Sequence, residues 1–345
     1  MALPQLSVVH GESLSSQISI DENALFLSDM QSLFGKERFA HVGSWQYSDS
    51  ESANDPVKGA FLWENFLKAT KNYYPLSGGI ELIKDKSGLL IGNRTEPTWI
   101  ADFGCGSEKA TTGKVIPVKR HFKNVTGYSP IDKSHTFLVE ASTAIEQDQS
   151  GIPIKAFQAD YAQDEIQLPN GKNFGIFFGS TISNIEGRPE DGMPIDEIIS
   201  LMTKLKSVLG DDGELLMDYD ANQDEQSILA SYMHDLQIEF GRNIMQRVKR
   251  DLPVFGDFDA NAWRYEPVWH EKTHQLCHTI VSERDMDFYL GDERFKIKAG
   301  EKFILNNSFK YPVEKMKEWC QEAGWNTQSH VMDNQNRMAL QLMAA

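Results

Sequence analysis

The chain has 345 residues, 40% of them hydrophobic, which is enough to bury one large core or two smaller ones. Its 50 acidic side chains outnumber its 34 basic ones, and the formal net charge of -16 repels nucleic-acid backbones and anionic membrane surfaces. The three cysteines, Cys105, Cys277 and Cys320, have neither metal-ligand spacing nor the even number of a disulfide framework.

The first two thirds of the chain predict helices followed by an α/β sheet. Residues 1–20 are polar and are expected to be frayed, whereas 22–72 have helical periodicity. From residue 98 we expect five buried strands, in TWIADFG, NVTGYSP, IKAFQAD, NFGIFFGS and GELLMDYD. Helices are expected at 134–147 and 195–209. This alternation predicts a parallel sheet that binds ligands at the carboxyl ends of its strands.

Residues 222–305 depart from this alternation. They predict a long helix over 223–250, an aromatic loop in VFGDFDANAWRYEPVW, and antiparallel strands in HQLCHTIVSE, DMDFYLGD and RFKIKAGEKFIL. The α/β pattern then returns, with a helix in VEKMKEWCQEAG and a strand pair in TQSHVMD and RMALQLMA. We therefore expect a Rossmann-like domain with a seven-stranded sheet, interrupted after its fifth strand by an inserted α+β domain.

The first strand of the sheet runs into the motif GCGSEK at 104–109. Because Gly104 and Gly106 lack a β-carbon, a ligand can approach the backbone, and the amides that follow can bind an anionic group. Glycines in tight turns also have purely steric uses, so the motif alone leaves both interpretations open. A dinucleotide fingerprint needs a third glycine and an acidic end to the second strand, which here is expected to end at Ser129. The shortened motif favours S-adenosylmethionine over NAD.

Polar residues also follow the third and fourth predicted strands. Asp160 follows the third strand, where such folds commonly hold the adenine amino group, although a capping role for Asp160 stays open. The fourth strand ends in FFGSTISNIEG, where Gly179 and Asn184 provide small and hydrogen-bonding groups near a transferred methyl; the alternative is an asparagine in a turn. His270, His274 and His278 recur every four residues, but the β-branched residues that follow predict a strand, so no metal site is expected.

Six motifs occur together between about Phe61 and the C-terminus. They are YYP (73–75), GCGSEK, GSTISN (179–184), Tyr232 followed by FGRNIM (240–245), DLPVFGDFD (251–259) and NNSFKY (306–311). With this set the chain resembles the S-adenosylmethionine-dependent amino-acid Nα-methyltransferases, the family typified by the histidine-specific enzyme of ergothioneine biosynthesis.

The resemblance implies roles for individual residues and for the two domains. The cofactor-binding residues would be Gly104, Gly106, Lys109, Ser129, Asp160, Tyr161 and Gly179, with Asp160 and Tyr161 at the adenine. The catalytic residues that grip the substrate's amine and carboxylate would be Tyr73, Asn184 and Tyr232, together with Gly179. The substrate side chain would be recognised by His278, Asn306 and Ser308. The Rossmann-like cofactor domain would comprise 73–221 and 306–345, and the substrate-recognition domain 21–72 and 222–305.

The sequence also departs from the family pattern. Ser129 replaces the acidic residue expected at the ribose, or that acid is displaced to Asp132. The turn after YYP reads LSGG in place of a segment with arginine and glutamate, and Phe39 occupies a position that usually carries tyrosine. In the histidine-specific enzymes a glutamate and a serine read the imidazole, whereas the aligned pair here is Asn306 and Ser308. The carboxylate that would accept an imidazole N–H is therefore missing.

We expect an S-adenosylmethionine-dependent N-methyltransferase that acts on the α-amino group of an amino acid or close derivative other than histidine. Two alternatives stay open: a histidine Nα-trimethylating enzyme, and an S-adenosylmethionine-binding protein with little turnover. The expected partner is a small-molecule amine, with no nucleic acid and no membrane. Since the first residues lack the features of a leader peptide, we expect a cytoplasmic protein, as a monomer or weak dimer.

Overall fold

The computed structural model describes residues 8–10, 22–35, 38, 42–47, 59–70, 73–179, 181–185 and 187–345. Its elements, in chain order, are β1 (Val8–His10), α1 (Glu22–Phe34), α2 (Gly43–Tyr47), α3 (Gly59–Ala69), α4 (Tyr74–Ile91), β2 (Thr98–Phe103), α5 (Glu108–Ala110), the π-helical turn η1 (Thr111–Val115), α6 (Ile116–Lys119), β3 (Val125–Asp132), α7 (His135–Asp148), β4 (Ala156–Gln158), β5 (Asn173–Phe177), the short 3-10 helices η2 (Thr181–Asn184) and η3 (Pro189–Asp191), α8 (Ile195–Leu209), β6 (Glu214–Asp220), α9 (Glu225–Tyr232), α10 (Asp235–Asp251), β7 (Val254–Asp257), β8 (Trp263–His270), the 3-10 turn η4 (Glu271–Thr273), β9 (Gln275–Ser282), β10 (Met286–Leu290), β11 (Glu293–Ile297), β12 (Lys302–Phe309), α11 (Val313–Glu322), β13 (Asn326–Met332) and β14 (Met338–Ala344).

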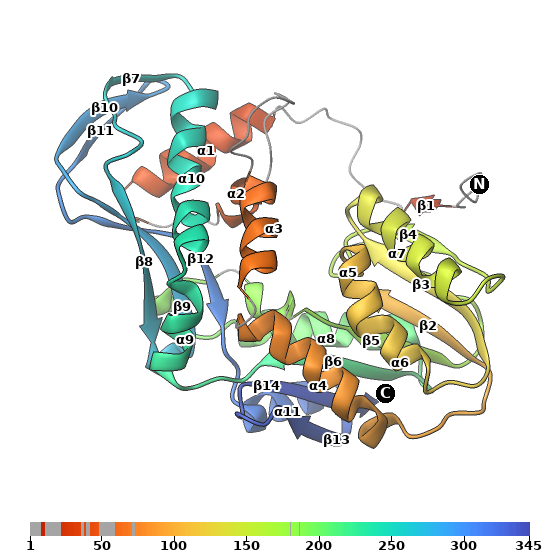
Figure 1. The fold of residues 1–345 in the computed structure, drawn as a ribbon. Coiled ribbons are helices and arrows are strands. Elements are labelled where there is room, and N and C mark those ends of the chain that lie inside the picture. Colours follow the sequence, from red (N-terminus) through yellow and green to blue (C-terminus); the bar gives the residue numbers. More distant parts are fainter. Residues whose placement is uncertain are drawn as a thin grey trace.

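A large mixed sheet forms the centre of the fold (Figure 1). Its strands, as far as the chain is described, follow the order β1-β4-β3-β2-β5-β6-β14-β13. The strands from β1 to β6 pair in parallel, whereas β14 is antiparallel to both β6 and β13. The predicted Rossmann-like fold is confirmed: the seven expected strands are present, and β1 adds an eighth at the edge beside β4. The sheet order reverses between β2 and β5, which is where such sheets bind ligands.

Two helical layers cover the sheet. The helices α4, α6 and α7 pack on one face through residues such as Leu82, Val118 and Leu138, and α8 and α11 pack on the other. Because side chains alternate along a strand, Leu215, Met217 and Tyr219 of β6 face α8 and α11. The two aspartates of the same strand, Asp218 and Asp220, consequently face the α4 side, where both are buried.

The inserted segment between β6 and α11 builds its own core together with the N-terminal helix. Two three-stranded sheets, β11-β10-β7 and β12-β9-β8, pack with α1 and α10 (Figure 1). Phe34 of α1 fixes this arrangement, since its ring contacts aromatic rings on β8, β10, β11 and β12. The boundary expected after residue 305 falls within β12, which continues to Phe309.

Four expectations about local structure need correction. The predicted helix over 223–250 is two helices: α9 ends at Tyr232, and His234 caps the new helix α10 by accepting a hydrogen bond from the Leu236 amide. The predicted aromatic loop contains the strands β7 and β8. Strand β3 extends beyond Ser129 to Asp132. Residues 8–10 form β1, and the rest of the segment expected to be frayed lies outside the described residues, as does Phe39.

Candidate active site

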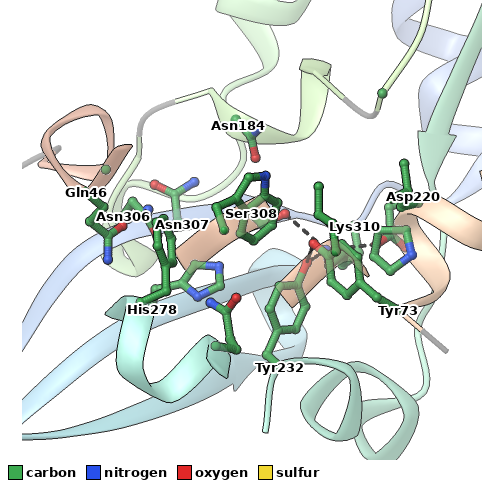
Figure 2. A pocket seen from close by; sticks show the side chains of 18 of the residues that line it. Gln46, Tyr73, Asn184, Asp220, Tyr232, His278, Asn306, Asn307, Ser308 and Lys310 are labelled. Carbon is green, nitrogen blue, oxygen red and sulfur yellow. Dashed lines mark hydrogen bonds and ion pairs between the residues drawn. The ribbon is translucent and has the colours of Figure 1, made fainter. Parts of the chain in front are cut away.

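A cavity of about 400 Å³ lies where the carboxyl ends of the sheet strands meet the inserted segment (Figure 2). Its wall is contributed by the turn after β2, the ends of β5 and β6, the N-terminal helices α2 and α3, and the inserted elements α10, β9 and β12. All seven residues that the sequence assigned to substrate binding line it: Tyr73, Gly179, Asn184, Tyr232, His278, Asn306 and Ser308. Residues from five different parts of the chain are thus brought to one place.

The turn after β2 has a backbone conformation that only glycine adopts without strain. Gly104 and Gly106 have φ of 71° and 63°. A β-carbon on Gly104 would lie 3.5 Å from Cε1 of Tyr161 and 3.9 Å from Oγ1 of Thr181. Cys105 between them is buried, which raises the pKa of its thiol, and it acts as a small filler rather than a reactive group. The turn is open where Ser107 reaches the cavity wall.

Of the other residues assigned to the cofactor, Gly179 lines the cavity, whereas Tyr161, Asp160 and Lys109 do not. Tyr161 stands beside Gly104 and packs edge-on against Phe103 and Phe177. The carboxylate of Asp160 accepts the Ala162 amide at 3.0 Å and pairs with Lys133 at 2.8 Å, which fits the capping alternative as well as a ligand role. Lys109 is exposed on α5.

Ser129 does not reach the site. It is completely buried within β3, and its hydroxyl accepts a hydrogen bond from the indole N–H of Trp99 at 2.9 Å. The acid at the end of this strand is Asp132, whose carboxylate accepts the amide of Gly106 at 3.3 Å and that of Ser134 at 2.9 Å. Asp132 therefore holds the glycine turn against the start of α7, and the displaced acid is the alternative that fits the geometry.

Asn184 lies across the cavity from two adjacent tyrosines, Tyr73 and Tyr232 (Figure 2). The ring of Tyr73, at the start of α4, meets that of Tyr232, at the end of α9, edge-on at 5.5 Å, and their hydroxyl oxygens are 3.4 Å apart. Burial and the charge of Asp220 raise the pKa of Tyr232, so its hydroxyl keeps its proton. The Asn184 amide is exposed at the end of η2 and makes no hydrogen bond to a described residue.

Lys310 and Asp220 form an ion pair in the cavity wall that sequence reasoning missed. Both side chains are 1% exposed, and Lys310 Nζ lies 2.8 Å from Oδ2 of Asp220. The same ammonium donates to the hydroxyls of Ser308 at 3.0 Å and Tyr232 at 3.2 Å, so each of its three protons has an acceptor. The signal was the MDYD end of the fifth strand, because aspartates in a strand that must be buried require partners.

His278 is a neutral side chain in this wall. Its Nδ1 is 2.6 Å from the hydroxyl of Tyr265, and its ring meets Tyr232 edge-on at 5.0 Å. Burial, and then the charge of Lys310, lower the pKa of His278 to about 3. His278 thus offers a hydrogen-bonding ring without positive charge.

Asn306 and Asn307, adjacent on β12, have different partners. Asn307 ties β12 to the loop after η2, since it donates to the carbonyl of Ile185 at 2.8 Å and accepts the Gly187 amide at 3.1 Å. Asn306 donates to Oε1 of Gln46 at 3.0 Å, whereas its own Oδ1 is buried and has no hydrogen-bond partner among the described residues. A buried, unpaired acceptor in a cavity wall is available to a ligand that carries an N–H or O–H group.

Comparisons with known proteins place these features in a family. The family model described as "Histidine-specific methyltransferase, SAM-dependent" matches residues 44–345. The histidine N-alpha-methyltransferase of Mycobacterium tuberculosis is 22% identical over 283 residues, covering 77% of this chain and 84% of that protein. The N-methyltransferase imqF of Aspergillus flavus is 23% identical over 278 residues, covering 77% and 73%.

Among solved structures, an S-adenosylmethionine-dependent methyltransferase from Clostridium acetobutylicum is similar with a TM-score of 0.41 and 11% identity, covering 83% of this chain and 96% of that one. No helix within the described residues is long and apolar enough to span a bilayer.

Proposed function

This chain belongs to the family of histidine-specific, S-adenosylmethionine-dependent methyltransferases, and we propose that it methylates the α-amino group of an amino acid, or a close derivative, other than histidine. The family gives the cofactor and the class of reaction, N-methylation. The acceptor is our proposal, and it rests above all on one observation: Tyr73, Asn184 and Tyr232 line the same cavity as Ser107 of the glycine turn.

The residues around the turn after β2 fit S-adenosylmethionine. The backbone at Gly104 and Gly106 has no side chain that would block the cofactor, and Asp132 is the acid in position for the ribose. Tyr161 provides an aromatic surface beside Gly104, as an adenine requires. When bound, S-adenosylmethionine supplies an electrophilic methyl group on a sulfonium.

The residues of the cavity would hold a neutral amine in line with that methyl group. Methyl transfer needs no covalent enzyme intermediate, so positioning supplies most of the rate enhancement. The Asn184 carbonyl and the Tyr73 hydroxyl can accept amine N–H bonds and aim the nitrogen lone pair. The aromatic ring of Tyr73 also favours the ammonium charge that develops, by about 0.5–2 kcal/mol.

The cavity wall argues against histidine as the preferred acceptor. Asp220 is the one carboxylate among the described lining residues, and its charge is already paired with Lys310. None of the described lining residues therefore offers a free carboxylate to an imidazole N–H, and the buried ammonium of Lys310 disfavours an imidazolium. The unpaired Oδ1 of Asn306 and the neutral ring of His278 suit an uncharged side chain that donates a hydrogen bond, and an aromatic side chain such as an indole or a phenol has both properties.

A screen of the twenty amino acids and common amines with isotopically labelled cofactor, read by mass spectrometry, tests the proposal. We expect label on an α-amino nitrogen, and a higher kcat/KM for tryptophan or tyrosine than for histidine. A clear preference for histidine would reject the proposed acceptor. Labelled products on other nitrogen atoms only would reject the α-amine.

The histidine enzyme is the alternative with specific support, since the family model and the Mycobacterium tuberculosis relative both carry that name. It requires Asn306 or His278 to replace the missing carboxylate. Efficient trimethylation of histidine would establish it. A binding protein with little turnover would instead bind S-adenosylhomocysteine and label none of the screened amines.

A further inference from the structure

A second buried lysine lines the cavity at its cofactor end. Lys114 belongs to the π-helical turn η1, which follows the glycine turn, and shares the cavity wall with Ser107 and Ala110. Lys114 is 2% exposed, and its Nζ lies 2.7 Å from Oδ2 of Asp218 on β6. Turns of π-helix inside a helix frequently occur at functional sites, because they turn side chains out of the regular register.

The surroundings of Lys114 are shaped to admit this side chain. A β-carbon on Gly79 of α4 would lie 3.3 Å from Nζ of Lys114 and 3.1 Å from Oδ2 of Asp218. The LSGG segment that departs from the family pattern therefore lets α4 pass over the ion pair. On its remaining side, the Lys114 ammonium lies 5.9 Å from the centre of the Phe178 ring.

Lys114 differs from Lys310 in how many of its protons are used. Lys310 donates to three acceptors, whereas Lys114 makes one hydrogen bond to a described residue, Asp218. An ammonium carries three N–H donors, and a buried charge is costly unless its donors are satisfied. Two donors of Lys114 thus lack an acceptor within the described chain, although the side chain forms part of a ligand cavity.

We propose that Lys114 binds the carboxylate of an α-amino acid in the cavity. A carboxylate can accept charge-assisted hydrogen bonds from both remaining N–H donors of the ammonium. Two ligands carry this group: the methionine end of the cofactor and the amino-acid substrate. The inference deepens the proposed function and rests on it, because that function supplies both carboxylates.

The test uses a double variant, Lys114→Met with Asp218→Asn, so that both charges of the ion pair are removed together. Its matched control is Lys119→Met with Asp148→Asn, which removes another lysine–aspartate pair from the same helical segment, at 2.9 Å and outside the cavity lining. Circular dichroism and thermal unfolding establish that both variants are folded. Isothermal titration then measures the Kd for S-adenosylhomocysteine and the Kd for 5′-methylthioadenosine, a compound that lacks the amino-acid end.

If Lys114 binds the cofactor carboxylate, the Kd for S-adenosylhomocysteine rises roughly ten- to a hundredfold in the cavity variant, and that for 5′-methylthioadenosine is unchanged. If it binds the substrate, both of these Kd values are unchanged. In that case tryptophan, tyrosine and histidine, added with S-adenosylhomocysteine, raise the Tm of the wild type more than their α-carboxamides do, and this difference disappears in the variant.

A folded cavity variant that binds S-adenosylhomocysteine and the amino acids like the wild type would overturn the inference, as would equal losses in the control variant. Failure of the proposed function looks different. The wild-type chain itself would then bind neither S-adenosylhomocysteine nor an amino acid, whatever residue stood at 114.

Discussion

The turn after β2 and the wall formed by β6 and β12 are built in different ways. In the turn, Gly104 and Gly106 at positive φ present backbone that carries no side chain of its own. In the wall, the charges of Asp220 and Lys310 are buried, paired and surrounded by hydroxyl groups. A ligand surface made of glycine backbone tolerates few substitutions, but its glycines can be recognised in the sequence. A buried pair depends on two residues at once, and neither reveals its partner.

The largest effect should come from removing one charge of the wall. Lys310→Met leaves Asp220 buried without a counter-ion, and we expect the free energy of unfolding to fall by about 3–5 kcal/mol. Urea denaturation measures it. Lys310→Met combined with Asp220→Asn should recover most of this loss. A double variant as unstable as the single one would show that the wall does not depend on charge pairing.

The turn is tested by Gly106→Val, which forces a β-branched residue to a φ of 63°. The strain costs about 1–3 kcal/mol, and the added side chain faces the expected cofactor, so the Kd for S-adenosylhomocysteine should rise tenfold or more. Gly151→Val is the matched control, because Gly151 has a φ of 84° in open space outside the cavity lining. It should lose stability but keep its affinity, and equal affinities in the two variants would place the cofactor elsewhere.

Asn184→Ala separates the two regions functionally. Loss of a hydrogen bond to an amine that gains positive charge in the reaction costs about 1.5–3 kcal/mol. The kcat/KM for the substrate found in the screen should therefore fall ten- to a hundredfold. The Kd for S-adenosylhomocysteine should stay the same, since Asn184 lies at the end of η2 rather than in the glycine turn. Normal turnover in this variant would remove Asn184 from the site.

The smallest effect concerns pH. The folded-state pKa of His278, about 3, lies below its ordinary value of about 6.5, so the unfolded chain binds the proton more readily. The stability that His278 contributes is full above pH 6.5 and is lost as the pH falls toward 3. Between pH 7 and pH 5 we expect the wild type to lose about 2 kcal/mol more than His278→Gln. If urea denaturation showed the same loss of unfolding free energy between pH 7 and pH 5 in both proteins, His278 would not be buried and neutral.

The sequence predicted those features that local patterns encode. The alternation of strand and helix patterns predicted the sheet, and the glycines at 104 and 106 predicted the turn. The end of β3 was misplaced because Pro130 lacks an N–H and normally interrupts a strand. In the structure Pro130 is paired with Asp102 of β2. On the other side of β3, the residues that pair toward β4 are Tyr128 and Ile131, so no pairing there requires an N–H from Pro130.

Features that depend on distant partners were not predictable in the same way. Lys310 stood within a recognised motif, but nothing near it in the chain indicates that Asp220 lies 2.8 Å away. Lys114 was overlooked for the same reason, since its partner lies on β6 and the space for it is provided by Gly79 of α4. The histidines at 270, 274 and 278 were correctly expected to lead into a strand, but the hydrogen bond of His278 to Tyr265 needed the pairing of β8 with β9.

The ion pair between Lys310 and Asp220 also limits where chimeras of this enzyme and its relatives can be joined. Asp220 ends the fifth strand of the central sheet, whereas Lys310 follows the last strand of the inserted segment, and the Tyr311 amide donates to the Asp220 carbonyl at 2.8 Å. A chimera that exchanges the insertion with crossover points after β6 and after Lys310 would separate the two charges into different parents. Crossovers placed before β6 and after Tyr311 carry the whole contact across, so the inserted segment is best transplanted together with the strand that precedes it.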